Sequence, residues 1–173
     1  MTRMRKKRFD TRRVAVCGLL LSMMLVLGWV EHLIPINIGI PGIKLGLSNS
    51  VLIFAVYMLD VPTSYVLMVL KVLLSCAFLG TPASVLLYGF AGGLLSITGM
   101  VLLSRVKGMH PVTVSMVGGV LHNVGQVAVY MIVMQTMGLM YYMAVLMLVG
   151  LGFGLLTGIC ANLVMKHMKH MKF

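Results

Sequence analysis

A lysine stands near the middle of an apolar segment that is long enough to cross a lipid bilayer. Lys71 lies in the segment 61–79, which carries no other charged residue. A charge at the centre of a membrane helix costs about 2.5–3.5 kcal/mol on insertion scales, so such residues usually face the bundle interior or a water-filled cavity. The chain is 60% hydrophobic and has only three acidic residues. Lys71 therefore limits both the fold and the function of this chain.

Six apolar segments, separated by breaks rich in Pro and Gly, predict an all-α integral membrane protein built as one six-helix bundle. Most of them reach the roughly 20 residues that a bilayer core about 30 Å thick requires. The second spans only about 22 Å at 1.5 Å per residue, so it must tilt or borrow residues from the preceding loop. The whole chain, 1–173, is expected to be one membrane domain. The expected helices are 14–34, 45–59, 61–79, 84–104, 112–137 and 139–165.

The positions of the basic residues predict how the bundle is oriented. The tails 1–13 and 166–173 and the loop with Arg105 and Lys107 hold 12 of the 14 Lys and Arg residues. Six crossings place these three segments on one face, which the positive-inside rule makes cytoplasmic. We therefore expect a multi-pass protein of the cell membrane with both termini in the cytoplasm. The charge of +11 is then explained by the membrane and not by nucleic acid.

The fifth segment carries a group of polar side chains on one helix face. Gly119, His122, Asn123 and Gln126 follow one another at helical spacing, which places them on the same side of the helix. Hydrogen-bonding side chains on one face of a membrane helix point into the bundle, where they join helices or contact a ligand. Both interpretations are open for these residues.

A second polar stretch begins at Lys44 and includes Asn49, and Glu31 lies at the expected outer end of the first helix, where it could pair with Lys44. A buried lysine needs a counter-charge or loses its proton. With Glu31 assigned to Lys44, and both aspartates expected at the cytoplasmic side, Lys71 has no evident acidic partner. We therefore expect an anionic ligand group there, either a phosphate, a diphosphate or a carboxylate. The alternative is that Lys71 snorkels or binds backbone carbonyls. The expected substrate-binding residues are Lys44, Asn49, Lys71, His122, Asn123 and Gln126.

Small residues recur at helical spacing on three segments and predict close helix contacts. Most such stripes pack helices within a bundle, but one of them could dock a partner protein. The sequence does not say which. The stripes are Ala15, Gly18 and Ser22 on the first segment, Gly89 and Gly93 on the fourth, and Gly150, Gly154 and Gly158 on the sixth.

Several motifs together resemble the Gx transporter family, whose members are also labelled heptaprenyl diphosphate synthase component I. The motifs are PGIKLGLSN, FLGTP, GFAGGLLS and GGVLHNVGQ. The resemblance implies a fold like the six-helix substrate-binding S components of energy-coupling factor transporters. Those proteins bind vitamins or related small molecules from outside and work with a transmembrane coupling protein and paired ATPases. They typically show an Ala-x-x-x-Ala stripe on the first helix, which Ala15, Gly18 and Ser22 do not reproduce.

The leading interpretation is a membrane uptake component that binds a small anionic or amphipathic solute. The alternatives are a noncatalytic subunit of heptaprenyl or polyprenyl diphosphate synthesis, and a structural membrane subunit with Lys71 paired inside the bundle. We do not expect an enzyme, because prenyl diphosphate synthases bind magnesium through paired Asp-rich motifs, and only Asp10 and Asp60 are present. No Walker A motif and no Cys pair occurs, so catalytic residues, metals and cofactors are not expected.

Overall fold

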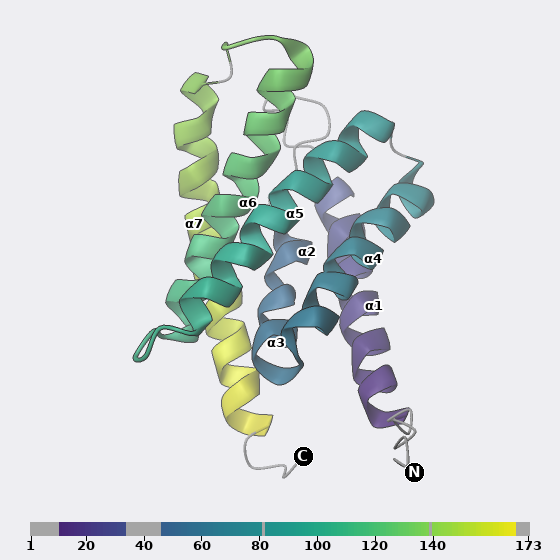
Figure 1. Cartoon of the computed structure of the whole chain (residues 1–173), viewed down its shortest axis with the longest axis vertical. Coiled ribbons are helices and arrows are strands. Elements are labelled where there is room, and N and C mark those ends of the chain that lie inside the picture. The colour runs from purple at the N-terminus through teal and green to yellow at the C-terminus, as the bar shows by residue number, and fades with distance from the viewer. Residues whose placement is uncertain (1–10, 34–45, 81, 139, 169–173) are drawn as a thin grey trace, which may run out of the picture.

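The computed structural model describes residues 11–33, 46–80, 82–138 and 140–168, and these residues form helices joined by short turns, with no strand among them. The all-helical fold expected from the sequence is confirmed. Figure 1 shows the helices running side by side along the long axis. They are α1 (Thr11–Leu33), α2 (Leu47–Ser50), α3 (Leu52–Met58), α4 (Val61–Leu79), α5 (Ala83–Ser104), α6 (Pro111–Met134) and α7 (Met140–Met168).

Five helices, α1, α4, α5, α6 and α7, are long and apolar enough to cross a membrane. The chain is therefore a multi-span membrane protein. The second expected helix, 45–59, is not continuous: α2 and α3 meet at Val51 and together form a shorter apolar stretch, Leu47–Met58. Each piece begins with a backbone hydrogen bond of 3.0 Å between residues three apart. Asn49 N–H donates to the Gly46 carbonyl, and Phe54 N–H donates to the Val51 carbonyl. Five of the six expected membrane helices are thus present as long apolar helices, and that the second segment crosses the membrane stays a prediction.

Proline and glycine set several helix ends, as the sequence predicted. Pro62 lies in the first turn of α4, and Pro111 is the first residue of α6. Proline suits a first helical turn because its missing N–H has no partner there in any case. Gly80 ends α4 in the left-handed conformation with φ of 59°, which costs glycine little. Gln135 adopts φ of 48° and ends α6 three residues before the end expected from the sequence.

The start of α1, the end of α7, the turn between α5 and α6 and the start of α4 lie at one end of the bundle (Figure 1). The basic segments next to these positions are the ones that the charge pattern placed on a single face. The arrangement of the described helices therefore agrees with an even number of crossings. That this face is the cytoplasmic one stays a prediction.

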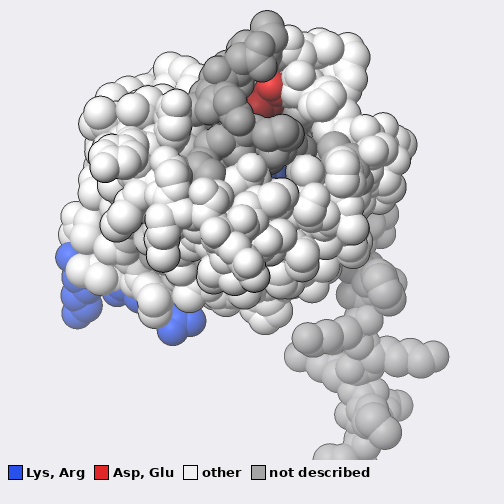
Figure 2. All heavy atoms as spheres, turned by 90° about the horizontal axis from the view of Figure 1, so that it is seen from above, with Lys and Arg blue, Asp and Glu red and all other residues white. Residues whose placement is uncertain are grey.

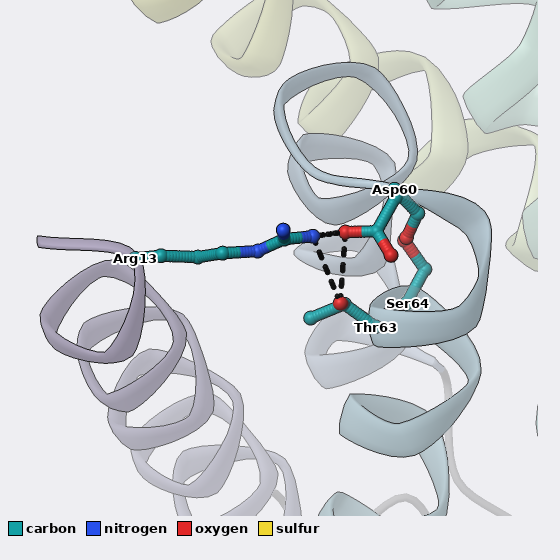
Figure 3. A network of polar contacts seen from close by, with 4 residues as sticks. All are labelled: Arg13, Asp60, Thr63 and Ser64. Atoms are coloured by element: carbon teal, nitrogen blue, oxygen red, sulfur yellow. Dashed lines mark hydrogen bonds and ion pairs between the residues drawn. The ribbon is translucent and has the colours of Figure 1, made fainter. Parts of the chain in front are cut away.

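A polar network joins α1 to α4 at this end (Figure 3). Arg13 forms an ion pair with Asp60 and donates a hydrogen bond of 3.2 Å to Thr63 Oγ1. Thr63 Oγ1 donates to Asp60 Oδ1 at 2.9 Å, and Ser64 Oγ donates to the Asp60 carbonyl at 3.1 Å. Both members of the ion pair are about half exposed (46% each). Exposed pairs contribute about 0–1 kcal/mol, so this network fixes position more than it stabilises the fold.

Helices α6 and α7 pack backbone to backbone at glycines. A Cβ added at Gly119 would lie 2.3 Å from the carbonyl oxygen of Gly150. A Cβ at Gly154 would lie 2.7 Å from Met116 Cα, and one at Gly158 would lie 2.9 Å from neighbouring atoms of α6. No side chain fits at these contacts. The stripe on the sixth segment therefore serves internal packing.

The other two stripes differ in their surroundings. The fourth-segment stripe faces α4, because a Cβ at Gly93 would lie 3.0 Å from Met68 Sδ, and one at Gly89 would lie 3.7 Å from Val72. The first-segment stripe is exposed, and a Cβ at Gly18 would have no atom of another residue within 4 Å. Ala15, Gly18 and Ser22 therefore remain available for a partner or for lipid.

Two glycines on α7 provide a matched test of this packing. Gly154→Ala should lower the free energy of unfolding by about 1–3 kcal/mol, because the new methyl group overlaps the α6 backbone. Gly152→Ala has open space around it and should be neutral or slightly stabilising, since alanine favours a helix by about 0.5–1 kcal/mol over glycine. Thermal unfolding of both variants in detergent, followed by circular dichroism, measures the difference. Equal melting temperatures would contradict the packing described here.

Candidate ligand-binding site

A cavity lies between α2, α4, α5 and α6 and contains about 420 Å³ of empty space, counting the open space at its mouth. Val72, Val85 and Leu86 form apolar parts of its wall. Three helices contribute the polar and titratable part. These residues are Ser48 from α2, Lys71, Ser75 and Cys76 from α4, and His122 and Gln126 from α6.

Lys71 lies in the middle of α4 and is 7% exposed. Ser75 follows it by one helical turn, so both side chains are on the cavity side of α4. Lys71 also has an interaction within the chain. The expected lack of a protein partner therefore cannot be used as evidence for a ligand at Lys71. The case for a ligand depends on its place in the cavity wall, beside groups from two other helices.

His122 and Gln126 lie one turn apart on α6, and both are buried. A hydrogen bond of 3.0 Å joins Gln126 Nε2 to His122 Nε2. Two glycines leave room for the imidazole ring. A Cβ at Gly92 of α5 would lie 2.9 Å from His122 Nδ1, and a Cβ at Gly46 would lie 3.0 Å from His122 Cδ2. The ring is therefore held between α5 and the start of α2.

Glu31 connects the end of α1 to the same region. Its side chain is 5% exposed, and its Oε1 accepts a hydrogen bond of 2.5 Å from the backbone N–H of Gly46. Gly46 has φ of 89°, a left-handed conformation that glycine adopts readily. The proposed ion pair of Glu31 with Lys44 cannot be compared with this contact, because Lys44 lies outside the described residues.

Asn49 and Asn123 do not line this cavity. Asn49 Nδ2 donates to Ser96 Oγ at 2.6 Å, and Ser96 Oγ donates to the Gly118 carbonyl at 2.7 Å. Asn123 Nδ2 donates to the Leu146 carbonyl at 2.6 Å. Both asparagines thus link helices, α2 to α5 and α6 to α7. Of the six expected substrate-binding residues, the structure brings together Lys71, His122 and Gln126.

Three polar residues of the cavity wall, Ser48, Ser75 and Cys76, were absent from the substrate-binding set predicted by sequence reasoning. Ser75 has a detectable signal, because it lies one turn after Lys71 on a regular helix. Ser48 precedes Asn49 on a helix that is broken at Val51, so its direction could not be read from spacing. Cys76 is partly exposed. A lone cysteine in an apolar run gives no signal of its place in a cavity wall.

The cavity combines a positive charge, an imidazole, an amide and two hydroxyl groups with an apolar wall. Such a set can bind an anionic group at one end and a short apolar body at the other. Among the described residues, no group of three or more His, Cys, Asp or Glu is placed to hold a metal ion. Figure 2 shows the molecule from above, where uncharged residues make up most of the described surface. Acidic atoms and a small basic spot are visible near the middle, and the larger groups of basic atoms lie at one edge.

Fold and site together define a multi-span membrane protein with a polar cavity between its helices. The chain belongs to the heptaprenyl diphosphate synthase component I family, whose model matches residues 20–164. The matched range includes all of the cavity residues. No curated protein and no solved structure matches the chain.

The positive charge of the cavity can be measured at Cys76. In a Cys17→Ala, Cys160→Ala background, an anionic sulfonatoethyl methanethiosulfonate should modify Cys76 faster than a cationic trimethylammonioethyl reagent, after correction for their rates with a free thiol. Lys71→Met should reduce this ratio by about tenfold, because Lys71 and Cys76 line the same cavity and a charge in a partly buried site changes the local potential by more than RT. A ratio that does not depend on Lys71 would contradict this electrostatic description of the cavity.

Proposed function

We propose that this protein binds a small anionic or amphipathic solute in the cavity around Lys71 and serves as the substrate-binding component of an uptake transporter. One observation carries the proposal: Lys71, His122 and Gln126 converge from two helices on one open cavity. Membrane interiors rarely keep a buried lysine without a functional role, and polar groups there usually mark solute or ion pathways. The solute would contact the ammonium group of Lys71 and the neighbouring hydroxyl and amide groups.

Energy for uptake would come from partner proteins. The chain contains no Walker A motif, so ATP-driven work requires separate ATPases and a transmembrane coupling protein. The exposed stripe of Ala15, Gly18 and Ser22 is the candidate docking surface, because it is not used in internal packing. Small residues would let a partner helix approach α1 closely.

A second candidate is a noncatalytic membrane subunit associated with heptaprenyl or polyprenyl diphosphate synthesis, which the description of the family favours. The cavity limits this candidate. The volume of about 420 Å³ includes the open space at the mouth, so the enclosed space is smaller. A heptaprenyl or longer chain could therefore place only its charged end in the cavity. In neither candidate does the chain act as an enzyme by itself.

Small molecules released from the purified protein test the leading proposal. The wild-type protein, extracted from its own membrane, should release a small anion that mass spectrometry detects. Lys71→Met keeps the length of the side chain but removes its charge, and the amount released should fall at least about tenfold. Lys107→Met removes an exposed charge in the turn between α5 and α6 and should change nothing. Equal release from both variants would argue against a ligand at Lys71.

Affinity purification of the tagged protein distinguishes the two candidates. Uptake predicts that ATPases and a coupling protein purify with it, and Gly18→Leu should reduce their amount by about fivefold or more through steric overlap. Gly152→Leu is the matched control, because neither glycine has an atom of another residue near its Cβ position. Recovery of a prenyl diphosphate synthase in place of ATPases would favour the second candidate.

A further inference from the structure

The connection between α6 and α7 is rich in methionine. Five of the chain's 18 methionines lie in the range 131–143. The same range contains no His, Cys, Asp, Glu, Lys or Arg. This part of the chain therefore offers thioether sulfurs without any charged, imidazole or thiol ligand beside them in the sequence. The five residues are Met131, Met134, Met137, Met140 and Met143.

These methionines have two kinds of surroundings. Met131 and Met143 are partly buried and pack against the same pair of buried residues, Val127 of α6 and Leu146 of α7. Methionine commonly fills gaps of this kind between helices. The other three are exposed, and packing within the described chain does not account for them. Their exposed fractions are 49% for Met134, 78% for Met137 and 66% for Met140.

The backbone holds the three exposed methionines close together. Met134 is the last residue of α6, and Met140 is the first residue of α7. Met140 N–H donates to the Met137 carbonyl at 3.1 Å, and the Cα atoms at the two ends of such a turn lie within about 7 Å of each other. Met134 precedes Met137 by three residues, so their Cα atoms are at most about 11 Å apart. Unbranched side chains with three rotatable bonds can bring their sulfurs together over such spans.

This connection lies at the end of the bundle opposite to the one where α1 and α4 begin (Figure 1). Met137 lies between the two helices, and irregular backbone is not found facing the hydrocarbon region of a bilayer. Tyr141 and Tyr142 follow at the start of α7 and are 89% and 48% exposed. Tyrosine is enriched at membrane–water interfaces. The exposed sulfurs are therefore accessible from water.

Neutral thioether ligands favour soft metal ions. Thioether and thiolate sulfurs select Cu(I), whereas Mg²⁺ and Ca²⁺ take oxygen ligands. Zn²⁺ is bound by Cys, His and carboxylate groups, and the range 131–143 has none of them. Criteria based on Cys and His therefore do not reveal a site of this kind.

We propose that the thioethers of Met134, Met137 and Met140 form a Cu(I)-binding site at the α6–α7 connection. The ion binds without a change in its oxidation state, and the ligands are neutral sulfurs, so no proton is released. The site is separate from the cavity around Lys71, whose wall contains none of these methionines. It does not depend on the proposed function.

Competition with the Cu(I) chelator bicinchoninate, without oxygen, measures binding to the full chain in lipid nanodiscs. Thiols and imidazoles elsewhere in the chain also bind Cu(I), so five of them are first replaced. This background carries Cys17→Ala, Cys76→Ala, Cys160→Ala, His167→Ala and His170→Ala. In it we expect roughly one Cu(I) ion per chain, as a single thioether site requires.

Two sets of substitutions in this background locate the site. Met137→Leu combined with Met140→Leu should weaken Cu(I) binding at least about tenfold, because even groups that only support metal ligands contribute about 10–100-fold to affinity. Leucine is close to methionine in volume, so the fold should be retained. Met23→Leu is the matched control, because Met23 is also exposed (43%) but lies on α1. It should leave the affinity unchanged.

X-ray absorption of the Cu(I)-loaded background protein provides a second measurement that needs no further variant. We expect ligation by sulfur alone. Sulfur ligation together with an affinity that falls in the double variant and not in Met23→Leu supports the proposal. Failure of the background protein to bind Cu(I), nitrogen or oxygen ligation, or an affinity that does not change in the double variant would each overturn it.

Discussion

Helix α6 packs closely against its two neighbours, α5 and α7, at glycines that allow the backbones to touch. On the α7 side, Gly119 meets the carbonyl of Gly150. On the α5 side, a Cβ at Gly92 would lie 2.6 Å from the carbonyl oxygen of His122, and one at Gly125 would lie 2.9 Å from Gly92 Cα. Lipid provides no hydrophobic drive for helix association, so packing and interhelical hydrogen bonds must hold these helices. The rotation of α6 about its own axis is fixed as a result.

That rotation decides what each polar residue of α6 can do. With α5 and α7 held against the glycines, Asn123 reaches the Leu146 carbonyl of α7. His122 and Gln126 face the cavity instead. One polar face predicted from helical spacing is thus divided between two roles. Asn123 links helices, and its neighbours present an imidazole and an amide to the space beside Lys71.

The sequence predicted the all-helical class, the ends of α4 and the central position of Lys71 on that helix, because each follows from local chemistry. Apolar length requires a membrane helix, Pro62 and Gly80 delimit α4, and 3.6-residue spacing places Ser75 beside Lys71. The break at Val51 was not predictable, since no proline or glycine marks it. Asn49 has the same polar signal as His122, yet it binds Ser96. Side-chain partners depend on how helices are rotated against one another, and a single sequence does not contain that information.

An experimental structure of the protein purified from its own membrane, without added ligand, tests the central claim most directly. We expect density that does not belong to the protein in the cavity, within hydrogen-bonding distance of Lys71 and next to His122 and Gln126. The same density should be absent from Lys71→Met. A cavity filled by ordered side chains of this chain, with Lys71 in an ion pair that leaves no space for a solute, would contradict the central claim.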